Sequence, residues 1–389
     1  MDSGKYIEIN SPEEAELKRS LEARTDADAK RMLRFLNMPD LSRAEGSPLR
    51  ELIGKILKIE RFSNFEEIKV PEIVRADHSF DLFNFPPEHP VRSASDTYYI
   101  DSNHILRTHT TIMWLYYLEQ EQIQEKIKNK ESMGVICYGK VYRKDEIDRN
   151  HMNVFHQVDG WYLAPKSKEP IGAEELKSVL MEIAQTIFGK EIEYRFNKDQ
   201  FPYTDPSIEM EVKISDPLRS EASRWIEVLG AGVVSGEVLK NLGVNPEEYN
   251  GWAFGFGLER LAIISMDLPD IRLLWSEDSR IKKQLKLGQK YVPVSKYPPI
   301  TRDISFVVDK SFIPNNYFDL IRDLGGDLVE QVELLDKYEN AEKFGEGKVS
   351  YTYRIVYRSN DRTLVSSEVD EIQNKIYSET AKQFNAELR

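Results

Sequence analysis

The stretch Gly251–Arg260, with the sequence GWAFGFGLER, restricts the possible folds of this chain more than any other segment. Gly255 and Gly257 alternate as they would on a β-strand, so one face of that strand is bare and a flat ring can lie against it. The segment from about Gly257 to Met266 is predicted to be a helix, and Arg260 lies near its start. The chain is therefore expected to contain a strand that leads directly into a helix carrying an arginine.

The chain before this stretch consists mainly of strand-like runs. Only residues 110–127 and 172–189 have helical patterns between them, and these two helices are spaced irregularly. This order is typical of an antiparallel sheet with helices packed on it rather than of repeated βαβ units, so the predicted fold class is α+β. The predicted strands are residues 66–74, 96–100, 133–143, 154–164, 191–196, 207–214 and 224–234.

Two further parts flank this sheet. A charged segment with partly helical spacing predicts an N-terminal helical arm, and Ser47 with Pro48 predicts the start of the first helix of the sheet domain. A basic, polar stretch with three prolines is typical of a linker. After it, strand, helix, strand, strand and helix follow in the order of a ferredoxin-like domain. The expected division is residues 1–45 (arm), 46–285 (sheet domain), 286–298 (linker) and 299–389 (ferredoxin-like domain).

Composition excludes several classes of protein. The net charge is −13, so any nucleic-acid partner must be met by local clusters of Lys and Arg. Cys137 is the one cysteine, which rules out an intrachain disulfide and a Cys/His zinc motif. No apolar run has membrane-spanning length, so no membrane partner is expected. The acid-rich N-terminus predicts neither a secretory signal nor a transit peptide, which favours a cytoplasmic location.

The segment RWIEVLGAGVVSG raises the alternative of a dinucleotide-binding site. Its glycines at 230, 232 and 236 resemble the fingerprint of such sites, but the third glycine comes one residue late. The second strand of a βαβ unit is also missing after it. Glycines that allow two backbones to approach closely are the favoured interpretation, and a dehydrogenase is disfavoured.

Two groups of residues have the composition of a ligand site. Arg143 ends an apolar strand, and Asp145 follows on the same face, where it can orient a guanidinium that binds phosphate. Phe155, Gln157 and Asp159 alternate on one face of the next strand, and a buried carboxylate needs a partner such as a cationic amine. The alternatives are a solvated Arg–Asp pair at an edge and an exposed polar face.

These residues carry a resemblance to a known family. An arginine–x–acid pair after a strand, followed later by Gly-x-Gly-x-x-Arg at a helix start, resembles the second and third motifs of class II aminoacyl-tRNA synthetases. Six ordered segments narrow the resemblance to phenylalanine–tRNA ligases: FDLFNFPPEHPVRSASDTYYI, LRTHTT, VYRKDEIDRNHMNVFHQVDG, FPYTDPSIEMEV, WIEVLGAGVV and GWAFGFGLERLAIISMDLPDIRLLW. SKYPPITRDISFVV and DLIRDLGGDLVEQVELLDKY resemble the anticodon-binding domain of the single-chain, mitochondrial-type form. The resemblance covers about residue 75 to the end.

The resemblance implies ATP-dependent attachment of phenylalanine to tRNA(Phe) through a phenylalanyl-adenylate. Arg143 and Arg260 would bind phosphates as the catalytic residues, Phe155 would stack on adenine, and Glu227 would contact ATP and its Mg²⁺. The implied ATP-binding residues are Arg143, Asp145, Asn150, His151, Met152, Phe155, Glu227, Gly257 and Arg260. The implied phenylalanine-binding residues are His109, Thr111, Ile112, Met113, Trp114, Gln157, Val158, Asp159, Phe201, Tyr203, Ala253 and Phe254. Arg354, Arg358 and Arg362 are the implied tRNA-binding residues, with Tyr351, Tyr353 and Tyr357 either stacking on bases or forming sheet core.

Three positions depart from the family pattern. Asp159 stands where the family usually has glutamate, Thr111 where it has serine, and Trp114 where it often has glutamine. These departures leave open a synthetase relative that activates another amino acid. A non-catalytic RNA-binding paralogue is a further alternative, although such a protein would be expected to lose Arg143 and Arg260. The single-chain form implies a monomer without an editing module, and a mitochondrial matrix location as the alternative to the cytoplasm.

Overall fold

The computed structural model describes residues 6–169, 171–215, 223–293 and 297–389, and the chain divides into two compact units. The first unit comprises Met1–Tyr142, Val154–Asp267 and Lys286–Lys290, and the second comprises Arg143–Asn153, Leu268–Leu285 and Tyr291–Arg389. Each unit has its own sheet and its own hydrophobic core. This division differs from the predicted boundaries, because two short segments from the predicted sheet domain pack with the C-terminal part.

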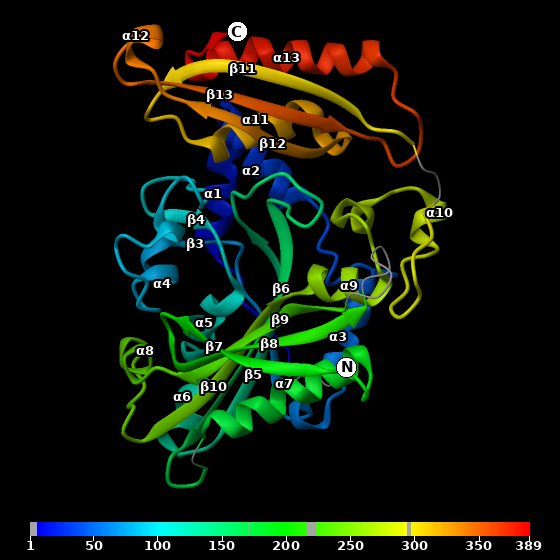
Figure 1. Cartoon of the computed structure of the whole chain (residues 1–389). Coiled ribbons are helices and arrows are strands. Elements are labelled where there is room, and N and C mark those ends of the chain that lie inside the picture. Colours follow the sequence, from blue (N-terminus) through cyan, green and yellow to red (C-terminus); the bar gives the residue numbers. More distant parts are fainter. Residues whose placement is uncertain (1–5, 170, 216–222, 294–296) are drawn as a thin grey trace. The chain divides into compact units, whose positions relative to one another are not determined.

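The first unit is built on an eight-stranded sheet (Figure 1). The three strands at one end of the sheet, β1, β2 and β5, are parallel to one another. Every other neighbouring pair is antiparallel. The prediction of an α+β fold with a largely antiparallel sheet is confirmed. In sheet order the strands are β1 (Tyr6–Glu8), β2 (Glu66–Lys69), β5 (Met133–Tyr142), β6 (Val154–Pro165), β10 (Tyr249–Gly257), β9 (Ser223–Val234), β8 (Thr204–Ser215) and β7 (Tyr194–Phe201).

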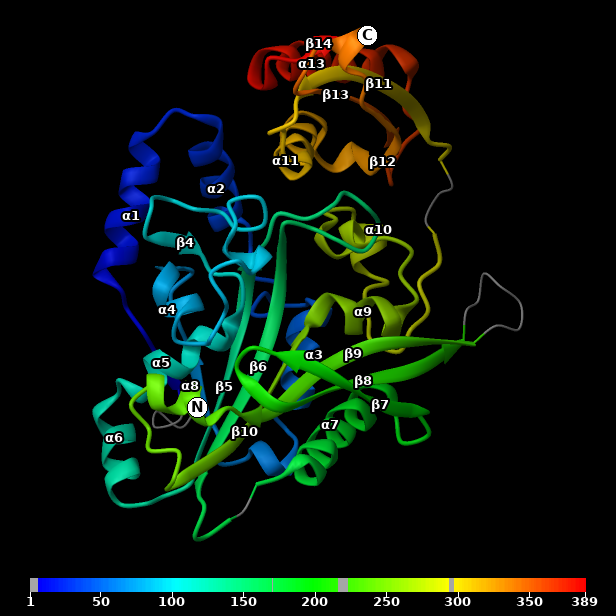
Figure 2. The same ribbon diagram turned by 60° about the vertical axis from the view of Figure 1, so that its left-hand side comes forward.

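Helices cover both faces of this sheet (Figure 2). On one face lie α3 (Pro48–Ile56), α7 (Ala173–Phe188) and α9 (Leu258–Met266), which contact one another and β6, β9 and β10. The apolar residues of α7 recur every three or four positions, from Leu176 to Ile187, and are buried because that stripe faces the sheet. On the other face lie the 3₁₀ turn η3 (Thr110–Ile112) and helices α5 (Met113–Leu118) and α6 (Glu121–Lys128).

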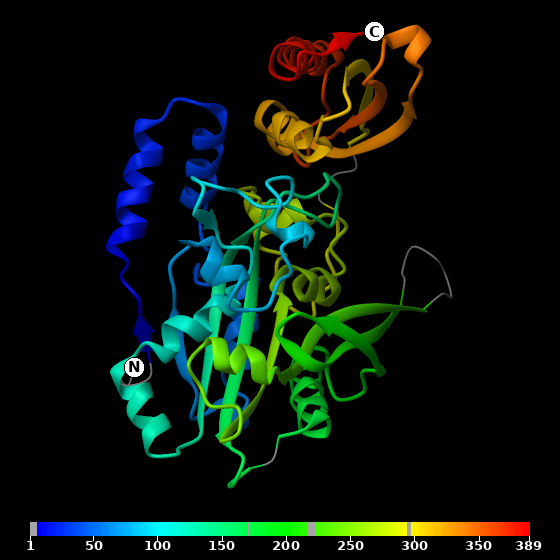
Figure 3. The same cartoon turned by 90° about the vertical axis from the view of Figure 1, so that its left-hand side faces the viewer.

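The predicted N-terminal arm forms two antiparallel helices, α1 (Pro12–Ala23) and α2 (Ala27–Asn37) (Figure 3). The side chains of Ser11 and Asp26 accept hydrogen bonds from backbone N–H groups in the first turns of these helices, as N-caps do. Ser47 likewise caps α3, which begins at Pro48 as predicted. The remaining elements of this unit are η1 (Glu60–Phe62), β3 (Ile73–Arg75), α4 (Ala76–Phe80), η2 (Pro90–Arg92), β4 (His104–Leu106) and α8 (Gly236–Asn241).

The predicted ferredoxin-like domain is present in the second unit. Its sheet has the order β12-β13-β11-β14, and helices α11 and α13 contact each other and pack on the sheet. Its core is rich in aromatic rings, because Tyr351, Tyr353 and Tyr357 alternate toward the helices. The elements are β11 (Ile300–Asp309), α11 (Pro314–Gly325), η5 (Gly326–Leu328), β12 (Val329–Tyr338), α12 (Ala341–Phe344), β13 (Lys348–Tyr357), α13 (Ser366–Phe384) and β14 (Glu387–Leu388), with η4 (Ile271–Trp275) and α10 (Ser279–Lys282) before them.

Among the described residues, no helix combines the length and apolar character needed to cross a membrane.

Candidate active site

One face of the large sheet has a floor of glycines around a single carboxylate. In register, Asp159 of β6 lies beside Gly255 of β10, and Gly255 lies beside Gly230 of β9. Cross-strand partners share a face of the sheet, so these residues form one row. A Cβ at Gly255 would overlap the Asp159 carboxylate, and one at Gly230 would come within 2.9 Å of the Phe201 ring. The glycines are therefore required because other side chains already occupy the space above them.

The glycines of β9 explain the segment that resembled a dinucleotide fingerprint. Both neighbours of β9 run antiparallel to it, so no βαβ unit is present. Gly232 lies against Thr204, and Gly230 extends the floor begun by Gly255. The glycines thus allow a close approach, but mainly by the side chains of Phe201 and Thr204 rather than by another backbone. Gly230 was not among the predicted site residues, although its alternation with Gly232 repeats that of Gly255 with Gly257.

The Asp159 carboxylate is 6% exposed and is held by two hydroxyl groups. Thr110 Oγ1 donates to Oδ2, and Thr111 Oγ1 lies 3.4 Å from Oδ1. Both threonines belong to η3, which places them above the row of Asp159 and Gly255. Thr110 was not predicted, although it adjoins Thr111. Gln157 lies two residues earlier on the same face of β6, and its buried Oε1 has no hydrogen-bond partner among the described residues.

Aromatic side chains stand around this carboxylate. Phe201 stacks on Tyr203 with ring centroids 5.9 Å apart, and Tyr203 meets Trp114 edge-on at 6.1 Å. Trp114 in turn stacks on Trp161 at 4.8 Å. His109, which is buried, stacks on Phe85 at 5.7 Å. The structure thus brings His109, Trp114, Phe201 and Tyr203 together with Asp159, as the resemblance implied.

Other predicted residues take different places. Val158 and Phe254 are buried on the opposite face of the sheet, where Phe254 packs against Phe62 and lies over Gly160. Strand alternation forces this arrangement, because each of them adjoins a residue of the glycine floor. Ile112, Met113 and Ala253 belong to the hydrophobic core that supports Trp114. Phe83, Phe85 and Trp161 were missed, although the FDLFNF run supplied the first two.

The candidate phosphate side of the first unit contains Arg260 and Glu227. Arg260 Nη1 donates to the Glu227 carbonyl oxygen at 3.2 Å and lies 3.6 Å from its carboxylate, and both side chains are half exposed. Burial raises the pKa of Glu227, and Arg260 opposes that rise. Gly257 lies beside Gln157 in register, and nothing lies within 4 Å of the position of its absent Cβ. Phe155 continues the face of Gln157 and Asp159.

The residues predicted in the Arg143–Asn153 loop belong to the second unit. Arg143 N–H donates to the Asn153 carbonyl at 3.0 Å, which closes the loop at its base. Ile147 is buried in the aromatic core of that unit, and its carbonyl accepts from Val332 N–H at 3.1 Å. The Asp145 carbonyl accepts from Arg322 Nη1 at 2.7 Å. The exposed Asn150 and His151 donate their N–H groups to Asp148, and the half-buried Met152 follows them.

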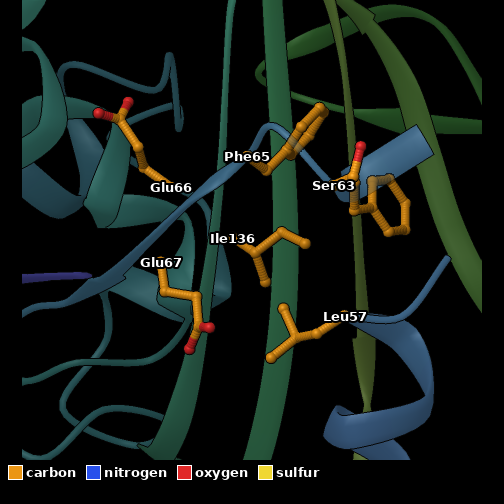
Figure 4. A pocket seen from close by; sticks show the side chains of 7 residues that line it. Leu57, Ser63, Phe65, Glu66, Glu67 and Ile136 are labelled. Atoms are coloured by element: carbon orange, nitrogen blue, oxygen red, sulfur yellow. The ribbon is translucent and has the colours of Figure 1, made fainter. Parts of the chain in front are cut away.

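A separate hollow lies against the opposite face of the large sheet, with a cavity volume of about 140 Å³ (Figure 4). Ile136 and Glu67 are neighbours in register on that face, and Figure 4 shows Glu66 pointing away from the other labelled side chains. The hollow is small and lacks the floor of glycines. Its lining residues are Leu57, Phe62, Ser63, Phe65, Glu66, Glu67 and Ile136.

Comparison with known proteins shows which family the chain belongs to. The family of tRNA synthetases class II core domain (F) matches residues 35–285, and the ferredoxin-fold anticodon binding domain matches residues 295–389. The chloroplastic/mitochondrial phenylalanine–tRNA ligase of Arabidopsis thaliana is 39% identical over 85% of this chain and 73% of its own length. The chain belongs to the phenylalanine–tRNA ligase family of class II synthetases.

Two further relatives have the same kind of name. A probable mitochondrial phenylalanine–tRNA ligase of Drosophila melanogaster is 35% identical over 84% of this chain and 79% of its own length. The mitochondrial phenylalanine–tRNA ligase of Saccharomyces cerevisiae is 32% identical over 88% of this chain and 87% of its own length. The family recognised from the sequence motifs is therefore confirmed.

In the anticodon-binding domain of this family member, the three arginines predicted to bind tRNA are all in ion pairs. Arg354 binds both oxygens of Asp303 at 2.8 Å, Arg358 Nε lies 2.6 Å from the buried Glu330, and Arg362 pairs with Glu368. The hydrogen bond from Arg354 lowers the pKa of Asp303.

The hypothesis that tyrosines of β13 stack on anticodon bases is wrong. Tyr351, Tyr353 and Tyr357 are 6%, 1% and 0% exposed, and Tyr357 donates to Gln373 of α13 at 2.8 Å. Their alternation with Arg354 and the residues beside it already placed them on the other face of the strand.

The glycine floor predicts different results for two neighbouring glycines of this synthetase. Gly255→Ala is expected to cost about 1–3 kcal/mol of folding free energy, because its methyl group would displace the Asp159 carboxylate. Gly257→Ala is the matched control, and its methyl group meets open space, so a change within about 0.5 kcal/mol is expected. The free energies of unfolding of both variants and of the wild type are measured by urea denaturation. Equal stability losses would contradict the arrangement of Asp159 over Gly255.

The raised pKa of Glu227 predicts a pH-dependent gain in stability for Glu227→Gln. The pKa of Glu227 is higher in the folded state than in the unfolded state, so the folded protein holds the proton more tightly. As the pH rises from the unfolded-state pKa to the folded-state pKa, ionisation of this carboxyl therefore lowers the stability of the fold. The melting temperature of Glu227→Gln should therefore be higher than that of the wild type at about pH 7.5 and equal to it at about pH 4.

Glu211, which faces Glu227 in register, is the control with the opposite sign. Hydrogen bonds from Arg195 and Asn197 lower its pKa, so Glu211→Gln should lose stability at the higher pH. A lower melting temperature for Glu227→Gln than for the wild type at about pH 7.5 would contradict the prediction.

Proposed function

We propose that the chain attaches phenylalanine to tRNA(Phe) in two steps, through a phenylalanyl-adenylate made from ATP. The observation that supports this most is the buried Asp159 carboxylate between aromatic walls, because phenylalanine has both an ammonium group and an aromatic ring. The printed names of the relatives give the same amino acid.

Asp159 and Gln157 would receive the ammonium group. The Gln157 Oε1 atom is buried without a hydrogen-bond partner among the described residues, and an N–H of the substrate would satisfy it. Thr110 and Thr111 would hold the aspartate in place, which matters because an aspartate is one methylene shorter than the usual glutamate. A carboxylate whose other contacts are fixed needs no reorganisation when the ligand binds.

The substrate ring would lie between the aromatic walls. Phe201, Tyr203 and Trp114 offer ring faces and edges, and edge-to-face packing is a favoured geometry. His109 would border the same space, and Ala253 would leave room beside it. Ile112, Met113, Val158 and Phe254 would support these residues from the surrounding core.

ATP would bind at the open end of the floor. Adenine would lie over Gly257 and against Phe155, where no side chain occupies the space at Gly257. Arg260 would bind the phosphates, together with Arg143. Asp145, Asn150, His151 and Met152 would complete the nucleotide site from the loop after β5.

The reaction needs no protein nucleophile. The phenylalanine carboxylate attacks the α-phosphorus of ATP, a mixed anhydride with AMP forms, and pyrophosphate leaves. A hydroxyl of the terminal tRNA ribose then attacks the carbonyl carbon, and AMP leaves. The protein contributes position and fixed positive charge where phosphate charge develops, which is the role of Arg143 and Arg260.

Mg²⁺ fits this site as an ion held mainly by the nucleotide. The described residues contain no group of three or more His, Cys, Asp and Glu side chains that could hold a metal, and Mg²⁺ usually keeps phosphate and water ligands alongside one or two carboxylates. Glu227 is the proposed protein ligand. When bound, Mg²⁺ would neutralise charge on the phosphates.

The proposed organisation of the chain follows from these roles. Residues 1–45 are the arm, 46–285 the catalytic domain, 286–298 the linker and 299–389 the anticodon-binding domain, within a monomer. For Arg354, Arg358 and Arg362 to contact tRNA, each guanidinium would exchange its carboxylate partner for a group of the RNA. The names of the relatives support an organellar location and give no support to the cytoplasmic expectation.

Phenylalanine-dependent ATP–pyrophosphate exchange tests the first step. Exchange is expected with phenylalanine and not with leucine or tryptophan, and Arg143→Ala should reduce it by more than about 100-fold because a phosphate-binding cation is lost. Exchange with a different amino acid would support the proposed reaction but contradict phenylalanine as its substrate. No exchange with any amino acid would favour the non-catalytic paralogue.

The same assay should detect activation of tyrosine. A pocket with apolar walls discriminates only modestly between two substrates whose rings differ by one hydroxyl. The ratio of kcat/KM for phenylalanine to kcat/KM for tyrosine should therefore stay below about 10⁵. The ratio is measured with purified amino acids at matched ATP concentration. A larger ratio would show that the pocket contains a polar group set against the hydroxyl.

A further inference from the structure

Behind the candidate site, the side chain of His156 in β6 connects this strand to α9, the helix that carries Arg260. His156 is 0% exposed and lies on the face of β6 opposite to Gln157. Its Nδ1 lies 2.6 Å from Glu259 Oε1, and its backbone N–H lies 3.0 and 2.9 Å from the two carboxylate oxygens. Glu259 is 3% exposed in the first turn of α9, where a carboxylate also faces the positive end of the helix dipole.

The other nitrogen of the imidazole faces the N-terminal part of the chain. Leu41 N–H lies 2.9 Å from His156 Nε2, and a backbone N–H can only donate. Nε2 is therefore an acceptor, so the proton lies on Nδ1 and is donated to Glu259. Asp40 Oδ1 lies 3.4 Å from the same Nε2 and already accepts from Ser42 N–H at 2.9 Å. The imidazole thus bridges two fixed partners, one at each nitrogen.

The turn that contains Leu41 is itself held firmly on the sheet. Lys140, the register neighbour of His156, is buried and donates to the carbonyl groups of Leu36 and Met38 at 2.8 and 2.9 Å. These are the carbonyl groups at the end of α2, which otherwise have no helical partner. Arg43 Nη2 donates to the Tyr138 carbonyl at 3.1 Å, with the guanidinium 4.1 Å from the Tyr138 ring centroid.

We propose that His156 is a positioning residue, which transmits the placement of the Asp40–Leu41 turn to the ATP side of the site. Phe155 precedes it in the chain, and Arg260 directly follows its partner Glu259, so two of the residues proposed to touch ATP adjoin this bridge. The Asp159 carboxylate is held separately by Thr110 and Thr111. The proposal rests on the proposed function and assigns a task to the segment between α2 and α3.

A backbone substitution tests the bridge while sparing the side chains of the site. Arg43 N–H donates to the Asp40 carbonyl at 3.1 Å, so Leu41 is the second residue of a four-residue turn, a position that favours proline. Leu41→Pro therefore keeps the turn and removes the N–H that binds Nε2. Leu41→Ala is the matched control, because it loses the same side chain and keeps the N–H.

Pyrophosphate exchange kinetics should separate the two variants. Leu41→Pro is expected to raise the KM for ATP about three- to tenfold, with the KM for phenylalanine and kcat within about twofold, as for the loss of one hydrogen bond in a buried network. Leu41→Ala should match the wild type within about twofold. Equal effects of the two variants, or equal changes in both KM values, would overturn the proposal.

A second variant keeps the proposal testable if proline prevents folding. Glu259→Gln is nearly isosteric, but its amide has one acceptor oxygen in place of two, so its NH2 group must face one of the two His156 donors, the backbone N–H or Nδ1–H. It should raise the KM for ATP more than that for phenylalanine. An unchanged KM for ATP would overturn the proposal.

Nitrogen NMR of histidine-labelled protein gives a readout that does not depend on catalysis. The chain has six histidines, and His156→Gln identifies the signals of this one. The wild type should show Nδ1 protonated and Nε2 unprotonated, and Leu41→Pro should shift the Nε2 signal. A protonated Nε2 would overturn the bridge, whereas absent exchange activity in the wild type would overturn only the proposed function.

Discussion

The structure of the site depends on one buried carboxylate that has room only because its neighbours are glycines. Asp159 is almost completely buried, and the free-energy cost of burying a charge is large unless hydrogen bonds or an opposite charge offset it. Two threonine hydroxyls offset part of that cost. Gly255 makes the position possible, since any Cβ there would take the space of the carboxylate. The proposed ammonium group would bring a positive charge to this carboxylate, and the attraction between the two charges would contribute to substrate affinity.

The two faces of strand β6 have different roles, one in the candidate site and one in structural support. One face presents Gln157 and Asp159 to the proposed substrates, and the other carries His156 into a bridge between α9 and the N-terminal part of the chain. Because consecutive residues of a strand point in opposite directions, His156 lies behind the sheet, whereas Phe155 and Gln157 beside it face the candidate site. The same alternation accounts for Phe254, which supports the sheet from behind while Gly255 beside it forms the floor.

The sequence predicted relations within one strand better than relations between strands. Alternation alone placed Gln157 and Asp159 on one face, and the same rule, applied to Phe254 and the tyrosines of β13, would have placed them correctly. The contact of Asp159 with Gly255, and the extension of the floor to Gly230, depend on the register of β6, β10 and β9. Register follows from side-chain packing across the whole sheet, and no short motif encodes it. Thr110 lay one residue from a predicted position, but only the 3₁₀ turn decides which hydroxyl reaches the carboxylate.

Charge places a further constraint on how the anticodon-binding domain can recognise RNA. From residue 296 to 389 the chain has 13 Lys and Arg against 17 Asp and Glu. Three exposed or half-exposed arginines of this domain are already neutralised by carboxylates of the same domain. A phosphate that replaced such a carboxylate would leave that negative charge close by, so the net electrostatic gain would be small. Affinity built on phosphate neutralisation alone needs many free cations and depends strongly on salt. For this domain, contacts with bases that fit its surface would therefore be the more effective source of affinity, and they would also provide the specificity that a synthetase needs for one tRNA.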